Sequence, residues 1–484
     1  MRSRRDQLQA YQFLRRRIVA ALLSGEPDAL DSPMRRIVRT TFAGTMVAVI
    51  LLGGFGFFGL IRKGSATSWK HGNSLIIQKE DGARFVWFGG KLHPMLNFAS
   101  ARLLLGPGDP KSVSRRSLAG VPRTPTLGIP LAPDSLPAAH DLIRAPWTVC
   151  AQTKDGRPEV TVLGGLRPNS PSLTADEGLV VTASTQPNAD KFVVWRQQLF
   201  RVTDPRLLAP LFVSAPPIRP VGAAWLTALP RSSDLRFPDI AGRGHVGPAI
   251  GARRTRVGQV VFVHSGVGAD HYYVVLTGGL APISAGVAEL LLYDPKNKST
   301  YPNGRPLALQ IGAGEFTSAF HLGPLLSVNS YPDRPLKPAG IPNGAVCASL
   351  AGTGSSADVA VYSVPSIPEA AADAVRVPAP DSGQGPALAD RIYLRPGSGA
   401  VVRAAPQPDI TTGTMFFLSD QGTKFPIADA ADLERLGYGK VSQPVLPPSF
   451  LDLFPTGPTL CRNAAALPIN AGRAAVLSAC SAQH

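Results

Sequence analysis

A stretch of 22 residues without a charged side chain, residues 40–61, constrains this chain more than any other feature of its sequence. A helix of this length reaches about 33 Å at about 1.5 Å per residue, enough to cross a hydrocarbon core of about 30 Å. A cleaved signal peptide is the alternative, and it would have a short leader and an apolar core of about 7–15 residues. The 39 residues that precede the stretch therefore favour a retained transmembrane helix.

Positive residues flank this stretch mainly on its N-terminal side, where Arg35, Arg36 and Arg39 lie close to it, whereas Arg62 and Lys63 follow it. The side with the excess of positive charge tends to stay in the cytoplasm. We therefore expect a cytoplasmic N-terminus and a large domain on the far side of the membrane.

The segment before the stretch has apolar residues at steps of three and four between positions 8 and 22, the pattern of one helical face. Gly25 could end this helix. A basic amphipathic helix beside a membrane span is suited to contact anionic lipid or a partner, and a solvated helix is the simpler alternative. The candidate contact residues are Leu8, Tyr11, Leu14, Arg15, Arg16, Arg17, Ile18 and Leu22.

The composition indicates a loop-rich protein, because Gly (48) and Pro (47) together make up about a fifth of the 484 residues. We expect an α+β, mainly β domain.

The net charge is +16, of which residues 1–39 contribute +5. The remaining +11 could attract anionic lipid or acidic wall polymers. No run of Arg and Lys interleaved with aromatic residues is present, which argues against a nucleic-acid partner.

All four cysteines follow the apolar stretch, which is typical of disulfides in an oxidising compartment. Four cysteines allow three pairings. We favour Cys150 with Cys347, which would join two distant segments, and Cys461 with Cys480, which would close a local loop. No Cys or His spacing typical of zinc occurs, and we expect neither a metal nor a cofactor.

A diverged repeat follows the apolar stretch. Residues 85–106 and 273–292 align with Leu92 opposite Leu280 and Pro94 opposite Pro282, and residues 192–208 and 416–439 look like further copies. Each copy reads as two strands and then a helix. The helices begin at good N-cap residues, namely Asn97, Asp204, Ser284 and Asp429. The copies are unevenly spaced, which excludes a solenoid. The alternative to a true repeat is chance similarity between short hairpin–helix units.

Strand-like segments lie between the copies, and we expect them to form one central β core. The segments are residues 147–152, 159–163, 179–183, 257–264, 344–350 and 359–364. We divide the chain into a basic cytoplasmic helix (1–39), a transmembrane helix (40–61), a linker (62–74), repeat 1 (75–120), the first part of the central β domain (121–185), repeat 2 (186–245), repeat 3 (246–300), the second part of the central domain (301–408), repeat 4 (409–445) and a C-terminal segment (446–484).

Several motifs, spread over essentially the whole chain, resemble the EccB family, the single-span subunit of the mycobacterial type VII (ESX) secretion membrane complex. They are LHPMLNFASARLLLG at 92–106, LGIP at 127–130, WTVC at 147–150, VGQVVFV at 257–263, YYVVLTGGLAPIS at 272–284 and LGYG at 436–439. The chain departs from the family in its short N-terminal arm and in the Cys461–Cys480 pair.

The resemblance implies an inner-membrane protein with an elongated periplasmic domain, whose four repeats resemble the wall-binding subunit of a phage lysin. It also implies a structural role within an oligomeric complex, with the EccC motor ATPase, EccD, EccE and a mycosin protease as partners, and possible contact with the cell wall.

Members of this family are sometimes named ATPases, and an exported nucleotide hydrolase is the alternative function. A P-loop ends in Gly-Lys-Ser/Thr, but Leu92 follows Gly90–Lys91 and Val441 follows Gly439–Lys440. His93 and His271 lie in the repeats, where we expect packing or surface roles. We therefore predict no catalytic residue.

Overall fold

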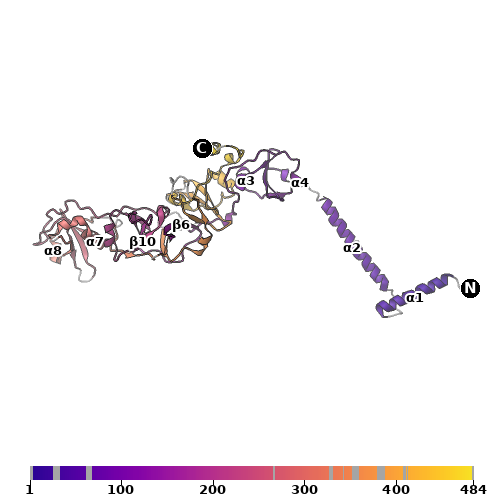
Figure 1. Cartoon of the computed structure of the whole chain (residues 1–484), viewed down its shortest axis with the longest axis horizontal. Coiled ribbons are helices and arrows are strands. Elements are labelled where there is room, and N and C mark those ends of the chain that lie inside the picture. Colours follow the sequence, from indigo (N-terminus) through magenta and orange to yellow (C-terminus); the bar gives the residue numbers. More distant parts are fainter. Residues whose placement is uncertain are drawn as a thin grey trace.

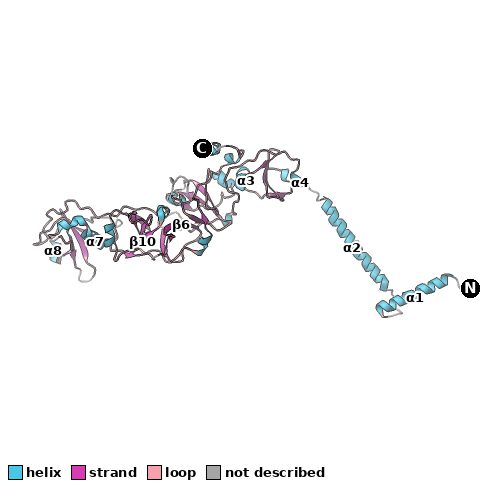
Figure 2. Ribbon diagram, in the orientation of Figure 1, coloured by secondary structure: helices cyan, strands magenta, loops and turns pink. Residues whose placement is uncertain are grey.

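The computed structural model describes residues 4–25, 33–61, 68–264, 268–302, 304–325, 331–341, 343–351, 359–378, 387–406, 410, 412–471 and 473–481. Two N-terminal helices lead into a long, rod-shaped domain (Figure 1). Strands dominate the rod-shaped domain and its helices are short, as Figure 2 shows. This mixed, mainly β architecture agrees with the predicted fold class.

Helix α1 (Arg4–Ser24) ends where Gly25 takes a positive φ of 71° and donates its N–H to the Ala21 carbonyl, at 3.1 Å. Gly takes this left-handed conformation at little cost, so the predicted helix end is confirmed. Helix α2 (Pro33–Ile61) begins seven residues before the predicted span, because the arginine-containing segment continues the same helix.

Four of the five sheets in the described chain share one strand order. In each, three consecutive strands are antiparallel, and a short strand after the helix returns to pair in parallel with the first strand. We call these units modules 1 to 4. Their sheets are β3-β2-β1-β4, β9-β8-β7-β10, β13-β12-β11-β14 and β22-β21-β20-β23.

The bounds of the module strands follow. Module 1 (residues 68–126) has β1 (Ser74–Gln78), β2 (Arg84–Phe88), β3 (Lys91–Pro94) and β4 (Lys111–Val113). Module 2 (177–235) has β7 (Glu177–Thr182), β8 (Lys191–Trp195), β9 (Gln198–Val202) and β10 (Ile218–Pro220). Module 3 (236–325) has β11 (Val260–Val263), β12 (His271–Leu276), β13 (Gly279–Ile283) and β14 (Leu309–Gln310). Module 4 (398–460) has β20 (Gly399–Ala404), β21 (Met415–Ser419), β22 (Lys424–Ile427) and β23 (Val445–Leu446).

The helix of each module starts at the predicted N-cap. Asn97 caps α3 (Phe98–Leu105), Asp204 caps η3 (Pro205–Leu207), Ser284 caps α7 (Ala285–Tyr293) and Asp429 caps α9 (Ala430–Arg435). In all four, the side-chain oxygen accepts a backbone N–H of the first turn, which satisfies a donor that has no partner within the helix. The remaining helices are η1 (Ser68–Lys70), α4 (Arg115–Leu118), η2 (Ala139–Asp141), α5 (Leu208–Leu211), α6 (Gly222–Thr227), η4 (Pro295–Thr300), α8 (Ala313–Thr317), η6 (Glu369–Asp373), α10 (Pro448–Leu451), α11 (Arg462–Ala465) and α12 (Arg473–Ser481).

The fifth sheet, which we call the central sheet, has the order β17-β16-β5-β6-β19-β18. It joins segments from both halves of the chain, as predicted. Its strands are β5 (Trp147–Lys154), β6 (Arg157–Gly164), β16 (Ala345–Leu350), β17 (Val359–Val364), β18 (Val375–Arg376) and β19 (Arg391–Tyr393). One further short strand, β15 (Lys337–Pro338), pairs with β7.

Shared apolar cores order the units along the rod. Modules 3 and 2 share one core, and module 2, the central sheet and module 4 share a second. Module 4, module 1 and the C-terminal helices share a third. The order from the far tip is therefore module 3, module 2, central sheet, module 4, module 1 and then the membrane helix, which agrees with Figure 1.

Two strands predicted for the central core belong elsewhere. Residues 179–183 lie mostly in β7 of module 2, and residues 257–264 contain β11 of module 3. Each pairs with the hairpin that directly follows it in the chain, because a short connection favours that neighbour over a distant sheet. The expected two-strand unit therefore has one more strand before the hairpin and another after the helix.

Candidate assembly site

The candidate transmembrane segment is part of α2. Residues Ile37–Phe57 have a mean hydropathy of 1.7, and none of them is buried in the isolated chain. A helical segment that is apolar on all sides and is not buried against its own chain fits a lipid environment.

The predicted contact residues of α1 lie on an uncovered helix. Leu8, Tyr11, Leu14, Ile18 and Leu22 are 55–81% exposed. Arg15, Arg16 and Arg17 are also exposed. Among the α1 side chains that the structure describes, Ala20 is the buried one, and α1 contacts α2. At 100° per residue, Ala20 lies on the side of the helix opposite the apolar stripe, so the stripe lies opposite the buried side of α1.

The first disulfide joins two adjacent strands of the central sheet. Cys150 of β5 lies directly opposite Cys347 of β16, with their Cα atoms 4.0 Å apart. Both residues are fully buried, and Tyr362, Val364 and Leu163 surround them. The favoured pairing therefore connects the two sequence halves of the central sheet.

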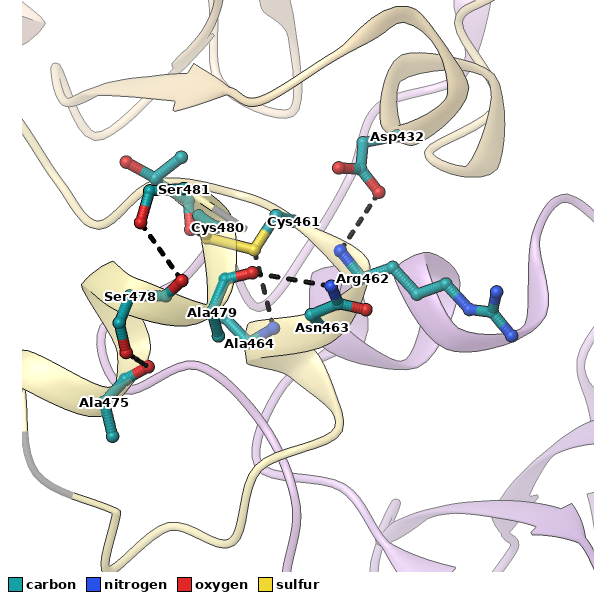
Figure 3. Close-up of a disulfide and its surroundings, with 11 residues drawn as sticks. Asp432, Cys461, Arg462, Asn463, Ala464, Ala475, Ser478, Ala479, Cys480 and Ser481 are labelled. Carbon is teal, nitrogen blue, oxygen red and sulfur yellow. Dashed lines mark hydrogen bonds between the residues drawn. A yellow bond between two sulfur atoms is a disulfide. The ribbon is translucent and has the colours of Figure 1, made fainter. Parts of the chain in front are cut away.

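The second disulfide, Cys461–Cys480, joins the start of α11 to the end of α12 (Figure 3). The Sγ atom of Cys461 also accepts the N–H of Ala464. Asn463 donates its side-chain N–H to the Ala479 carbonyl, at 3.4 Å. The two helices therefore form one unit, which we call the C-terminal clasp (residues 461–481).

The clasp holds module 1 against module 4. Gly128 donates its N–H to the Leu467 carbonyl at 3.1 Å, and Ile469 donates to the Thr126 carbonyl at 3.0 Å. Helix α11 packs on α3 of module 1. Ala99, Leu103 and Leu433 lie in one apolar cluster with the clasp cysteines. The last described residues therefore connect modules that are some 300 residues apart in sequence.

Asp432 of α9 lies in the junction between module 4 and the clasp. It is 1% exposed, and its Oδ1 accepts the backbone N–H of Arg462 at 3.0 Å. Its Oδ2 is buried and has no hydrogen-bond partner. Burial, together with the nearby Asp429, raises the pKa of Asp432 to about 6.

The glycine–lysine pairs show no phosphate-binding arrangement. Gly89 and Gly90 form the turn between β2 and β3, and Gly439–Lys440 lies in an exposed turn after α9. His93 packs in module 1: its ring stacks on Phe88 at 3.8 Å, and Thr124 Oγ1 lies 2.9 Å from its Nδ1. His271 is exposed. Among the residues that the structure describes, no group of three or more His, Cys, Asp or Glu side chains could hold a metal ion.

Sequence reasoning missed the clasp and Asp432. It predicted the disulfide, but the pairing of residues 126–128 with 467–469 joins short, irregular segments that carry no strand pattern. The nearest sequence signal was the apolar stretch of residues 464–467 next to a cysteine.

Comparison with known proteins places the chain in a family. A family model described as the type VII secretion system ESX-1 transport TM domain B matches residues 2–471. The protein named ESX-3 secretion system ATPase EccB3 of Mycolicibacterium smegmatis is 28% identical over 477 residues, covering 95% of this chain and 89% of that protein. The ESX-5 secretion system ATPase EccB5 of Mycobacterium tuberculosis is 29% identical over 488 residues, covering 95% and 92%.

Solved structures agree with this match. A chain of an intact ESX-5 inner membrane complex has a TM-score of 0.67 and 26% identity, covering 98% of this chain and 96% of that chain. The EccB3 dimer from the ESX-3 core complex has a TM-score of 0.63 and 27% identity, covering 82% and 100%. With a family model that spans nearly the whole chain, and relatives alike in sequence and fold along their length, this chain belongs to the EccB family of type VII secretion proteins.

Proposed function

We propose that this chain is the membrane-anchored structural subunit of a type VII secretion complex. The observation that carries the proposal is the architecture, in which a single candidate membrane helix leads into a continuous rod of five packed units. Extended apolar cores and two disulfides suit a rigid scaffold.

The test is co-purification with the other membrane subunits. A variant without residues 1–61 should lose the complex while its ectodomain stays folded by circular dichroism. In a second variant, an unrelated apolar helix of equal length replaces residues 40–61. Assembly of this variant would mean that the helix only tethers the chain, and loss of assembly would mean that the helix makes specific contacts. Normal assembly of the first variant would contradict the scaffold role.

The partners follow from the family resemblance. We propose EccC, EccD, EccE and a mycosin protease as neighbours, with the N-terminus in the cytoplasm and the rod in the periplasm. The apolar stripe of α1 and the arginines Arg15 and Arg16 beside it are exposed, which supports a contact with lipid or with one of these subunits. Changing Leu14 and Ile18 to Gln should then weaken co-purification, while Gln9→Ala on the other side of the helix should not.

The four modules are proposed to be diverged copies of one unit. Their common strand order and their matching N-caps support this origin. Contact of these modules with the cell wall, and their likeness to a phage-lysin subunit, remain proposals that rest on the resemblance. A pull-down with insoluble wall material tests the contact.

Nucleotide hydrolysis is the second candidate, because relatives are named ATPases. ATP turnover is measured with the purified ectodomain, residues 62–484. If the chain is a scaffold, no single point mutation should abolish any turnover that is seen. Turnover lost in a single variant, such as Lys91→Ala or Lys440→Ala, would favour the enzyme.

A further inference from the structure

Positive charge in the ectodomain is concentrated in module 1, the unit next to the membrane helix. Residues 68–126 contain nine Lys or Arg and three Asp or Glu, a net charge of +6, and Arg62 and Lys63 precede them. The whole chain after residue 61 carries +11. Most of the ectodomain's excess charge therefore lies at its membrane end.

The sheet of module 1 has two different faces. One face carries α3, which packs toward module 4 and the clasp. The other face is covered by η1, α4 and residues 119–123, with Trp69, Leu118 and Val121 in its core. In Figure 1, α4 lies on the side of α2 and α3 lies on the side of the rod. We call the side with η1 and α4 the membrane-side face.

Basic side chains cluster on this face. Lys70 lies over the Trp69 ring at 5.3 Å, and Arg123 lies over the Phe85 ring at 5.3 Å. Arg116 is exposed on α4. In the described part of the chain, these three have no carboxylate partner.

Two further basic side chains of this face already have partners within the module. Arg115 forms an ion pair with Asp81 at 3.1 Å, and its backbone N–H is bound by Glu80. Lys111 donates to the Ser68 carbonyl at 2.9 Å. Lys70, Arg116 and Arg123 therefore remain available for an external anion.

The length of the chain keeps this face close to the bilayer. Seven peptide units separate Ile61, the last residue of α2, from Ser68 of η1. Even a fully extended chain of this length reaches only about 25 Å. Trp87 is half-buried on the same face, and aromatic residues of this kind are common at membrane interfaces.

We propose that the membrane-side face of module 1 docks on anionic phospholipid headgroups of the leaflet that faces the ectodomain. Lys70, Arg116 and Arg123 would bind the headgroup phosphates, and the contact would set the angle of the rod against the membrane. Each basic residue near an anionic surface strengthens binding about fivefold. The proposal rests on the membrane anchoring of the chain, but not on its partners.

An anionic wall polymer is the competing anion. It would be reached more easily by the distal tip, whereas the charge lies at the opposite end of the rod. The charge distribution therefore favours lipid.

The experiment uses the full chain, without partner subunits, in nanodiscs of phosphatidylcholine alone or mixed with phosphatidylglycerol. The acetylation rate of Lys70 is measured by mass spectrometry, with exposed Lys296 of module 3 as the internal reference. Phosphatidylglycerol should slow acetylation of Lys70 severalfold, and high salt should reverse the effect. Lys296 should not change.

A variant with Arg116→Gln and Arg123→Gln keeps the Lys70 reporter and should lose most of this protection. The matched control, Lys154→Gln with Lys440→Gln, removes two exposed charges elsewhere and should keep it. Equal Lys70 rates in the two lipids, or full protection in the double Arg variant, would overturn the proposal. A third outcome would also overturn it: wall material binds the wild type but not the double Arg variant, and lipid binds neither. Neither result depends on complex assembly, so the scaffold role is tested separately.

Discussion

Asp432 carries a pH dependence at the scale of a single residue. Its pKa is about 6 in the folded chain, raised first by burial and then by Asp429, against about 3.9 when unfolded. The charged groups that act on its pKa are Asp429, the N-cap of α9, Arg435 of α9 and Arg462 of α11. The folded state therefore favours the protonated carboxyl. This preference stabilises the fold fully below about pH 4, and the stabilisation is lost as the pH rises through about 6.

We predict that Asp432→Asn reduces the difference in thermal stability between pH 5 and pH 7.5. Asn cannot ionise, so it removes a contribution that changes by on the order of 1 kcal/mol over this range. Unfolding of the chain followed by circular dichroism at the two pH values measures it, with exposed Asp239→Asn as the control. An unchanged pH dependence in Asp432→Asn would show that the carboxyl does not titrate there.

Gln197 joins module 2 to the central sheet through its side chain. Its Oε1 accepts the N–H of Val361 on β17 at 2.9 Å, and its Nε2 donates to the Leu173 carbonyl at 3.0 Å. Arg196 and Gln197 occupy the β8–β9 turn with φ of 48° and 61°, the conformation that Gly89 and Gly90 take in module 1. A non-glycine residue is strained there, and the bridge across the sheet edge offsets that strain.

Replacing Gln197 by Gly separates the two effects. Glycine relieves the backbone strain, but it leaves the Val361 N–H and the Leu173 carbonyl without their partner. We expect a net loss of about 1–2 kcal/mol in the free energy of unfolding. Chemical denaturation measures it, and Gln198→Ala, at an exposed neighbouring position, should have little effect. A more stable Gln197→Gly variant would mean that strain outweighs the bridge.

At the scale of elements, the two disulfides close loops of very different length. Cys150–Cys347 spans 197 residues and Cys461–Cys480 spans 19. In the chain-entropy model the longer loop stabilises by about 5 kcal/mol and the shorter by about 3 kcal/mol.

We predict that the double serine variant at Cys150 and Cys347 lowers the midpoint of unfolding more than the one at Cys461 and Cys480. Only the variant at Cys461 and Cys480 should make the clasp sensitive to limited proteolysis. Cys480 lies on the surface helix α12, whereas Cys150 and Cys347 are fully buried. Mass spectrometry of the fragments identifies the cut. Cleavage first within the central sheet of the second variant would count against this assignment.

The sequence predicted some elements well and others poorly, for physical reasons. Helix starts were predictable, because Asn97, Asp204, Ser284 and Asp429 satisfy local N–H groups. The closing strands were not, since β14 and β23 have two residues each and no alternation of apolar side chains. Their pairing depends on tertiary packing, as does the contact between Asp432 and Arg462.

At the scale of the whole molecule, the clasp explains how a long chain forms one rod. The chain leaves the membrane in module 1, runs to the tip in module 3 and returns through module 4. Module 1 is bound to module 4 by the clasp and by the α3–α9 contact. The Tyr438 hydroxyl of module 4 also donates to the carbonyl of Pro137, in the segment that follows module 1, at 2.8 Å. Any force that passes from the membrane helix to the rod therefore crosses this junction.

Removing residues 461–484 should loosen the junction without unfolding the units beside it. The deletion exposes Ala99 and Leu103 of α3 and leaves only the direct contacts between modules 1 and 4. Spin labels at exposed Lys79 and Lys440 should then give a broader distance distribution by pulsed electron spin resonance. A label pair at Lys154 and Lys440, between the central sheet and module 4, should keep its width, because the second core is intact. If the Lys79–Lys440 distribution stays narrow, the direct contacts hold the modules together and the clasp is dispensable for the shape of the rod.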